Sequence, residues 1–485
     1  MKAWEIEKLS IGSQIPVHFE DDTKELWEEQ TGDTEKYWDD AIKIYWGSRV
    51  PGSLARDTMA VAAIQAQENR GYKVKDAENL LLSGFRAVTE DDSAALQRAT
   101  YELFEACRNA EKDPESDFWN YTQYESFAQY AQAVSFPAPV KIDMGKSLEE
   151  KIHAGWLSQI VGGAYGTCME GYTTDNIEKA YNDVRRYVRR PNTYNDDVTY
   201  ELALLCAYER CGKATSSRDI AYEWLSRISF GWSAEDMALR NLRCGLLPPE
   251  SGRFNNPFRE WIGAQMRGVI LGQIYPGNPA KAAEAAWQDA EISHYNSGVL
   301  GEVFNALLCS MAFYEKDLRK LAEAAVALMP EDSQYGSVVR FALECCKASS
   351  GWLEAWRPCE KKLERYNWVH AFPNAAVEVI ALWFGNGDFT DMLEICGRCG
   401  RRMTVRYHTR RGVEIPDYQC QNRCIQDGTA RCQAVPGAVV DDAVGNLLLD
   451  TLTPHALEVA LTVQVELDTR AAEADALRRH HVERA

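Results

Sequence analysis

The sequence lacks any long run of apolar residues, so it has none of the about 18 in succession that a membrane-spanning helix needs. Residues 1–7 also lack the apolar core of a secretion signal. The 14 cysteines stand singly or in close pairs rather than in the spaced framework of a small secreted protein. We therefore expect a cytoplasmic protein that keeps its thiols reduced and has no membrane partner.

Positive charge is also scarce, because 53 Lys and Arg residues stand against 72 Asp and Glu residues, a net charge of −19. A balance this acidic argues against a general nucleic-acid binder and against docking on anionic membranes. The 485 residues exceed the usual size of one hydrophobic core, so two or three domains are expected. With 46% hydrophobic residues, the chain can bury a large interior.

Strand-like alternation of apolar and polar residues does not persist anywhere, whereas apolar residues recur at helical spacing along the chain. The fold class is therefore predicted to be all-α. The segment Phe136-Pro137-Ala138-Pro139-Val140 breaks the helical pattern and predicts the end of an N-terminal helical domain, residues 1–140. A second helical domain is predicted over residues 147–400, and a tail of different composition over residues 401–485.

The helix start at Asn195-Asp196-Asp197 is the first candidate for chemistry. Asn195 suits an N-cap, since its side-chain oxygen can accept a free N–H of the first turn. The helix dipole favours the two carboxylates in that turn, so an acidic helix start with no further role explains the same residues. The functional interpretation is half of a site for a hard cation such as Mg²⁺, which prefers oxygen ligands.

A glycine-rich helical segment ending at Glu170 is the second candidate. Gly155, Gly162, Gly163 and Gly166 stand within it, and each interior glycine costs about 1 kcal/mol relative to alanine. We therefore expect another helix or a ligand to approach closely. A carboxylate delivered by such a turn is well placed for a site, although a surface glutamate explains Glu170 equally well.

Two polar loops between helical segments complete the candidate site. One contains Gly263-Ala264-Gln265-Met266-Arg267, and the other contains Ser293-His294. A histidine in a turn-prone loop is more available to a ligand than one on an apolar helix face. The alternative is a surface or capping histidine.

These four pieces, in this order, resemble the ADP-ribosylglycohydrolase family, which includes the dinitrogenase reductase-activating glycohydrolases. Its first motif, Gly-Asp-x-x-Gly-x-x-x-Glu, is similar to residues 162–170, with Gly163 in the place of the Asp. Its Thr-Asp-Asp metal motif is similar to residues 195–197, with Asn in the Thr place. Its glycine-rich phosphate loop ending in Met-Arg resembles residues 263–267, and its Thr-His pair resembles residues 293–294.

The resemblance implies a compact orthogonal helical domain that hydrolyses the glycosidic bond of an ADP-ribosyl or related N-ribosyl group. It also implies two Mg²⁺ ions over the ribose, with Asn195, Asp196 and Asp197 as metal ligands. Glu170 and Asp197 would have the catalytic roles, and a carboxylate near the anomeric carbon can both stabilise positive charge and activate water.

The same resemblance assigns substrate binding to the two loops. Backbone N–H groups of Gly263 and Ala264 would hold the diphosphate, and Ser293 and His294 would contact the ligand. The implied partner is an ADP-ribosylated protein or a small ADP-ribosyl or ribosyl compound, with no role for nucleic acid.

The sequence departs from the family where the second half of the metal site should stand. That half is an Asp-x-Asp-Thr or Asp-x-Asp-Cys motif after a glycine-containing turn, but here Arg401-Arg402 follow Gly400 and no carboxylate appears before Glu414. Two arginines would repel the cations. The second Mg²⁺ is therefore in doubt, and the alternative function is a catalytically inactive binding or structural relative on the same scaffold. An unrelated helical interaction protein is a third reading.

The composition changes at the same place, since residues 401–485 contain no Lys, Trp or Phe. One hypothesis is that a change of reading frame near residue 398 replaced the native C-terminal segment. The alternative is a genuine divergent tail. In that tail Cys396-x-x-Cys399 could bind zinc together with cysteines from the set Cys420, Cys424 and Cys432.

Overall fold

The computed structural model of the chain describes residues 2–16, 27–181, 188 and 196–385, and the backbone of strands at 404–410, 413–420 and 433–436. The chain divides into two compact units, Met1–Asn182 with Tyr187–Gly387, and Asp183–Arg186 with Asp388–Ala485. Asn195, Arg401, Arg402 and the tail cysteines other than Cys420 lie outside the described residues.

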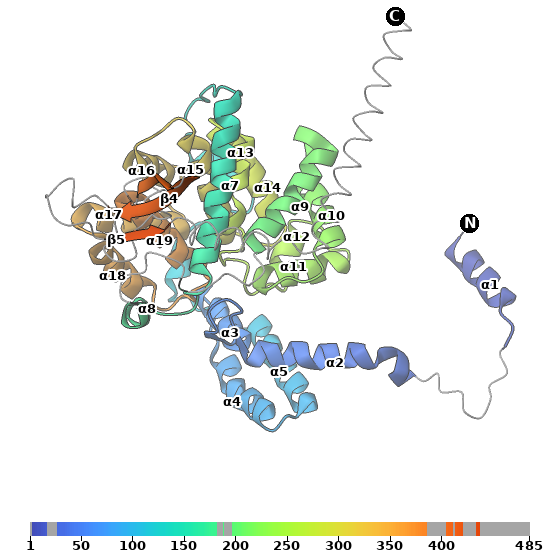
Figure 1. Cartoon of the computed structure of the whole chain (residues 1–485). Helices are drawn as coiled ribbons and strands as arrows, with labels where there is room; N and C mark the ends of the chain where they lie inside the picture. Colours follow the sequence, from blue (N-terminus) through green and yellow to red (C-terminus); the bar gives the residue numbers. More distant parts are fainter. Residues whose placement is uncertain are drawn as a thin grey trace, which may run out of the picture. The chain divides into compact units, whose positions relative to one another are not determined.

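The first unit is all-α, as predicted, apart from a two-residue hairpin of β1 (Ser48–Arg49) and β2 (Arg56–Asp57). Its N-terminal part contains six α-helices among the described residues: α1 (Ala3–Ser13), α2 (Trp27–Trp46), α3 (Met59–Asn69), α4 (Lys75–Thr89), α5 (Ser93–Asn109) and α6 (Phe127–Ala133). The next three helices are α7 (Lys146–Gly166), α8 (Thr174–Tyr181) and α9 (Asp196–Cys211). Figure 1 labels α1 to α5 and α7 to α9 along the chain.

The remaining helices of this unit follow in short succession. They are α10 (Ser217–Arg227), α11 (Ser233–Arg243), α12 (Glu250–Arg253), α13 (Val269–Ile274), α14 (Pro279–Ala290), α15 (Ser297–Ala312), α16 (Leu318–Ala327), α17 (Gln334–Ala348), α18 (Trp352–Leu363) and α19 (Ala371–Phe384). A 3-10 turn, η3 (Gln265–Arg267), lies just before α13. In Figure 1, α9, α10, α11 and α12 form one group of neighbouring helices.

Apolar helix faces build one large core across α9 to α19. Trp224, Phe304 and Phe372 lie within it with almost no exposed surface. Burial of this apolar surface is the main stabilising contribution. A smaller core under α2, α4 and α5 surrounds Trp46, whose indole N–H donates to the Thr100 hydroxyl at 2.7 Å. A third apolar cluster contains Met59 of α3 together with Phe258 and Trp261, so it joins the N-terminal helices to the segment after α12.

The glycines of α7 do not share one cause. A Cβ at Gly155 would lie 2.8 Å from Nε2 of Gln273, so close approach explains that glycine. A Cβ at Gly162 or Gly166 would meet nothing within 4 Å. The expected close approach of another element is therefore found at Gly155 and is absent at Gly162 and Gly166.

The second unit contains a three-stranded antiparallel sheet among its described residues. Its order is β3 (Thr404–Arg410), β4 (Val413–Cys420) and β5 (Gln433–Pro436), with Val405 opposite Tyr418 and Tyr418 opposite Val435. The expectation that no strand pattern exists along the chain is therefore wrong for this segment. In β3 the residues Val405, Tyr407 and Thr409 alternate with Arg406, His408 and Arg410, so the period-two pattern of a strand is present over this short segment.

Across the residues that the structure describes, no helix is both long enough and apolar enough to cross a membrane.

Candidate functional site

Two carboxylates open helix α9, as the sequence predicted. Asp196 is its first residue, with its side chain exposed, and Asp197 follows with a half-buried side chain. The first-turn backbone N–H groups lower the pKa of Asp196, but the surrounding protein desolvates this carboxyl, and its pKa is raised on balance. The helix start thus presents two carboxyl groups whose pKa values are raised.

Glu170 lies in the turn that follows α7, and its side chain is half-buried. Burial raises its pKa to about 7, and the negative charge of Asp196 adds to the rise. The pKa of Asp197 is also raised to about 7, by burial first and then by the charges of Asp196 and Glu170. These three predicted residues therefore lie near enough to one another for their charges to interact.

A fourth carboxylate, Glu235, joins this group from the first turn of α11. Its side chain is buried, which raises its pKa to about 7 against the opposing influence of Arg267. The charge of Asp196 raises the pKa of Glu235, and Glu235 in turn raises that of Asp197. We name Glu170, Asp196, Asp197 and Glu235 the acidic cluster.

The acidic cluster is not a complete metal centre by itself. Within the described ranges, no three His, Cys, Asp or Glu side chains converge closely enough to hold a metal ion. What the cluster offers is carboxyl groups with pKa values of about 7, as in Glu170 and Asp197. Such groups can both accept and donate a proton near neutral pH, which suits general acid–base chemistry.

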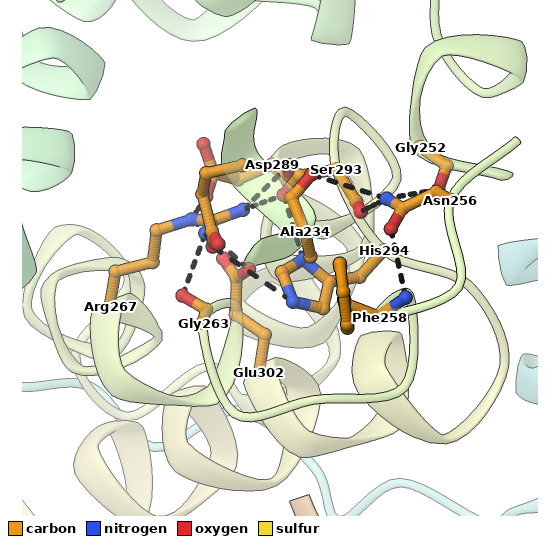
Figure 2. A network of polar contacts seen from close by, with 11 residues as sticks. Ala234, Gly252, Asn256, Phe258, Gly263, Arg267, Asp289, Ser293, His294 and Glu302 are labelled. Carbon is orange, nitrogen blue, oxygen red and sulfur yellow. Dashed lines mark hydrogen bonds and ion pairs between the residues drawn. The ribbon is translucent and has the colours of Figure 1, made fainter. Parts of the chain in front are cut away.

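Beneath the cluster, Arg267 is the centre of a buried ionic network (Figure 2). Its side chain is 1% exposed and forms ion pairs with Asp289 and with Glu235, the latter at 3.0 Å. Oε2 of Glu302, a completely buried residue, lies 3.6 Å from Nε of Arg267, the nitrogen that also contacts Asp289. The three carboxylates hold the pKa of Arg267 above its ordinary value, although burial alone would lower it. The arginine therefore carries a permanent positive charge within this network.

Ser293 and His294 close the same network. The Ser293 hydroxyl accepts from Nη2 of Arg267 at 3.0 Å and lies 2.7 Å from Nδ1 of His294. The hydroxyl can donate its own hydrogen to Nδ1 while it accepts from Arg267, and in that tautomer the imidazole proton is on Nε2. Nε2 lies 3.9 Å from the Glu235 carboxylate and has no hydrogen-bond partner among the described residues.

The histidine loop is not exposed, contrary to the expectation from its polar sequence. Ser293 is 0% exposed and His294 is 1% exposed. Burial and the Arg267 charge lower the pKa of His294 well below its ordinary value, so the ring is neutral. Asn256 covers the loop, donating to the Ser293 carbonyl at 2.9 Å and the Gly252 carbonyl at 2.9 Å (Figure 2).

The predicted phosphate loop packs against the same network. The Gly263 carbonyl accepts from Nη1 of Arg267 at 2.7 Å. A Cβ at position 263 would lie 2.0 Å from Oε1 of Glu235, so any larger residue there would displace this carboxyl group. Ala264 is completely buried. The loop is therefore locked to the acidic cluster through Glu235.

Sequence reasoning missed several acidic residues near the site. Glu201, one turn after Asp197 on α9, is 1% exposed and has a pKa raised to about 8, chiefly by burial. In the sequence, Glu235 cannot be distinguished from an ordinary acidic residue of a helix start. Asp289 and Glu302 lie within helices and carry no local signal of a site. The i, i+4 spacing of Asp197 and Glu201 was the one signal present, because such residues share a helix face.

Comparison with known protein families gives two overlapping matches. The ADP-ribosylglycohydrolase family matches residues 144–405, more than half of the chain. The recombinase zinc beta ribbon domain matches residues 393–449. The tail thus resembles a family other than that of the first unit, and the frame-change hypothesis stays a prediction.

One curated relative is the uncharacterised protein y4bA/y4pH of Sinorhizobium fredii (strain NBRC 101917 / NGR234). It is 44% identical over 91 residues, which are 19% of this chain. The matched stretch spans only 13% of the length of that relative.

Proposed function

Because this chain belongs to the ADP-ribosylglycohydrolase family, we propose that its first unit binds one Mg²⁺ and an ADP-ribosyl or related ribosyl group. We propose further that its hydrolysis of the glycosidic bond is slow or absent. The acidic cluster is the observation that supports binding, since its carboxylates raise one another's pKa and so favour a nearby cation. The missing acidic motif after residue 400 supports the loss of rate.

The residues of the acidic cluster suit a single Mg²⁺. Mg²⁺ prefers oxygen ligands and usually keeps several waters, so one or two carboxylates can bind it. Asp196 and Asp197 would supply those carboxylates, and Asn195 a neutral oxygen. A bound Mg²⁺ would supply Lewis-acid chemistry and orient the ribose hydroxyls.

A second Mg²⁺ does not fit this sequence. In the family order, the second acidic motif should follow the turn at Gly400, where Arg401 and Arg402 stand. Both family matches cover this position, the ADP-ribosylglycohydrolase match to residue 405 and the recombinase zinc beta ribbon match from residue 393. We therefore derive no step that requires two metal ions.

The protein groups would act on the ribose as follows. Glu170, with a pKa of about 7, would exchange a proton with a water or with the leaving group of the glycosidic bond. Arg267 holds Glu235 and Ser293 in place and has no free direction for a phosphate, since its contacts lie within the buried network. The backbone of Gly263 and Ala264 remains the proposed contact for the diphosphate.

Calorimetric titration of the full chain with MgCl₂ and with ADP-ribose tests this proposal. We expect one Mg²⁺ per chain, and we expect Asp197→Asn to abolish its binding. Asp175→Asn is the matched control, because Asp175 is an exposed first-turn aspartate of α8 paired with Arg357. Two bound Mg²⁺ with rapid hydrolysis of an ADP-ribosyl substrate would contradict the proposal that hydrolysis is slow or absent. No bound Mg²⁺ would contradict the proposed metal site at Asp196 and Asp197.

We propose a separate function for residues 393–449, the binding of one zinc ion. The recombinase zinc beta ribbon match and the β3–β4–β5 sheet support it. Cys396 and Cys399 have the spacing of a zinc ligand pair, and two of Cys420, Cys424 and Cys432 would complete four thiolates. Elemental analysis should find one zinc per chain, and Cys399→Ser should remove it, whereas Cys244→Ser, an exposed thiol of the first unit, should not.

A further inference from the structure

A groove separate from the acidic cluster lies between the N-terminal helices and the loop that precedes η3. Its volume is about 950 Å³, and its walls come from α2, α5, α11, residues 255–259 and the chain at and just after the end of α3 (Gln67, Arg70 and Tyr72). A volume of this size is at the upper end of the range for small-molecule sites. None of the four acidic-cluster residues lines it. We name it the N-terminal groove.

Aromatic side chains line the N-terminal groove from both helices. Trp38 of α2 is 52% exposed and Tyr101 of α5 is 68% exposed. Between them Tyr45 and Phe104 are half-buried and meet edge to face at 6.2 Å. Exposed aromatic rings of this kind provide stacking surfaces for flat ring systems, and each stacked base contributes roughly 1–3 kcal/mol.

The charge of the N-terminal groove is opposite to that of the chain. Four arginines line it, Arg70, Arg108, Arg240 and Arg259, with Glu105 as the one acidic residue of the lining. A guanidinium donates in a fork that matches phosphate oxygens. Arg240 is paired with Asp236 at 2.8 Å, so Arg70, Arg108 and Arg259 are the lining arginines left to attract an anion.

Arg70 is buried, Arg259 is half-buried, and both are incompletely neutralised. Arg70 is 7% exposed, and burial together with the charge of Arg259 lowers its pKa to about 9. Nε of Arg259 is buried and has no hydrogen-bond partner among the described residues. Glu260 partly offsets both charges, but it is buried and does not line the groove. An anion at this end would satisfy an unused donor and relieve the repulsion between the guanidinium groups.

We propose that the N-terminal groove binds a nucleoside monophosphate, with the base against Trp38 and Tyr101 and the phosphate toward Arg70 and Arg259. Two features distinguish this class from simpler ligands. A free anion would leave the aromatic wall without a partner, and an uncharged ring would leave Nε of Arg259 unsatisfied. The site does not depend on the function proposed for the acidic cluster.

Calorimetric titration of the full chain with AMP tests the inference, with adenosine and inorganic phosphate as partial ligands. We expect AMP to bind at least about tenfold more tightly than either partial ligand, since stacking and charge act together. Equal affinity for phosphate and AMP, or for adenosine and AMP, would overturn the proposal. Failure of AMP to bind at millimolar concentration would overturn it too.

Variants locate the binding in the groove. Tyr101→Ala with Arg108→Gln removes two exposed side chains of the lining and should weaken AMP binding about tenfold or more. Arg98→Gln is the matched control, because Arg98 is an exposed residue of the same helix outside the lining. The variant Asp197→Asn should bind AMP as the parent does. Unchanged binding in the double variant would place AMP outside the N-terminal groove, and loss of binding in Asp197→Asn would place it at the acidic cluster; either result would refute the proposal.

Discussion

Arg267 and Asp289 form an ion pair in which both side chains are 1% exposed. Such a pair repays the cost of removing two charges from water only with good geometry and further hydrogen bonds. Arg267 obtains these bonds from Glu235, Gly263 and Ser293, which come from three separate parts of the chain. One guanidinium therefore holds the acidic cluster, the predicted phosphate loop and the histidine loop in a single arrangement.

Replacing Arg267 by Met should destabilise the first unit by about 3–5 kcal/mol, because the buried carboxylates of Glu235, Asp289 and Glu302 would lose their shared cation. Chemical denaturation followed by circular dichroism measures the loss. The control is Arg253→Met, which breaks an exposed pair with Glu250 and should cost less than about 1 kcal/mol. A cost for Arg267→Met as small as that of the control would refute the role assigned to the network.

A methyl group at position 263 should displace Glu235, since it would lie 2.0 Å from Oε1 of that residue. We expect Gly263→Ala to destabilise the first unit by about 1–3 kcal/mol and to weaken Mg²⁺ binding. Gly162→Ala is a matched control on α7, where a Cβ meets nothing within 4 Å. That substitution should stabilise the chain by up to about 1 kcal/mol, because alanine favours a helix over glycine. Equal effects of the two substitutions would argue against the contact.

Local patterns predicted the helices of the first unit and the start of α9 at Asp196, because helix periodicity and acidic first turns are properties of nearby residues. Glu235 escaped prediction because its role depends on Arg267 and Asp197, which approach it only in the folded chain. The sequence gives an acidic first turn at α9 and at α11 alike. Only the packing of these helices in the folded chain shows which acidic first turn belongs to the site.

The burial of His294 was not predictable from the polar composition of its loop. The loop needs partners for its polar groups, and these come from Asn256 and Arg267, both distant in the sequence. Gly252 lets the surrounding chain pack closely over the loop, since a Cβ at this position would lie 2.9 Å from the backbone nitrogen of His294. A turn-prone sequence predicts a loop but does not reveal whether other segments cover it.

Glu201 should make the stability of the first unit depend on pH. Its pKa is raised from 4.5 to about 8, so the folded chain holds a proton that the unfolded chain releases above pH 4.5. Stability should therefore fall as the pH rises from about 5 to 8, and Glu201→Gln should remove part of that fall, roughly 2–4 kcal/mol. Denaturation curves at pH 5 and pH 8.5 measure it.

The matched control for Glu201→Gln is Glu209→Gln, an exposed position on the same helix α9. It should leave the difference in stability between pH 5 and pH 8.5 unchanged. The interpretation of Glu201 would be wrong if Glu201→Gln left the stability at pH 8.5 no higher than that of the parent chain.

Mg²⁺ binding should strengthen as the pH rises through 7. Glu170 and Asp197 each have a pKa of about 7 in the metal-free chain, so protons occupy part of the acidic cluster at lower pH. A cation binds the charged carboxylates and must displace these protons. We expect the affinity for Mg²⁺ to rise about tenfold between pH 6 and pH 8, measured by calorimetric titration in buffers of different ionisation enthalpy.

The variant Glu170→Gln distinguishes the contribution of Glu170 from that of Asp197 in that experiment. It removes one negative charge beside the helix start, so the pKa of Asp197 should fall and the rise in affinity should move to lower pH. The variant should therefore release fewer protons than the parent chain when Mg²⁺ binds at pH 6.5. A pH profile that Glu170→Gln leaves unchanged would mean that Glu170 does not act on the metal-binding carboxylate, because a charge close enough to raise the pKa of Asp197 must shift its titration when it is removed.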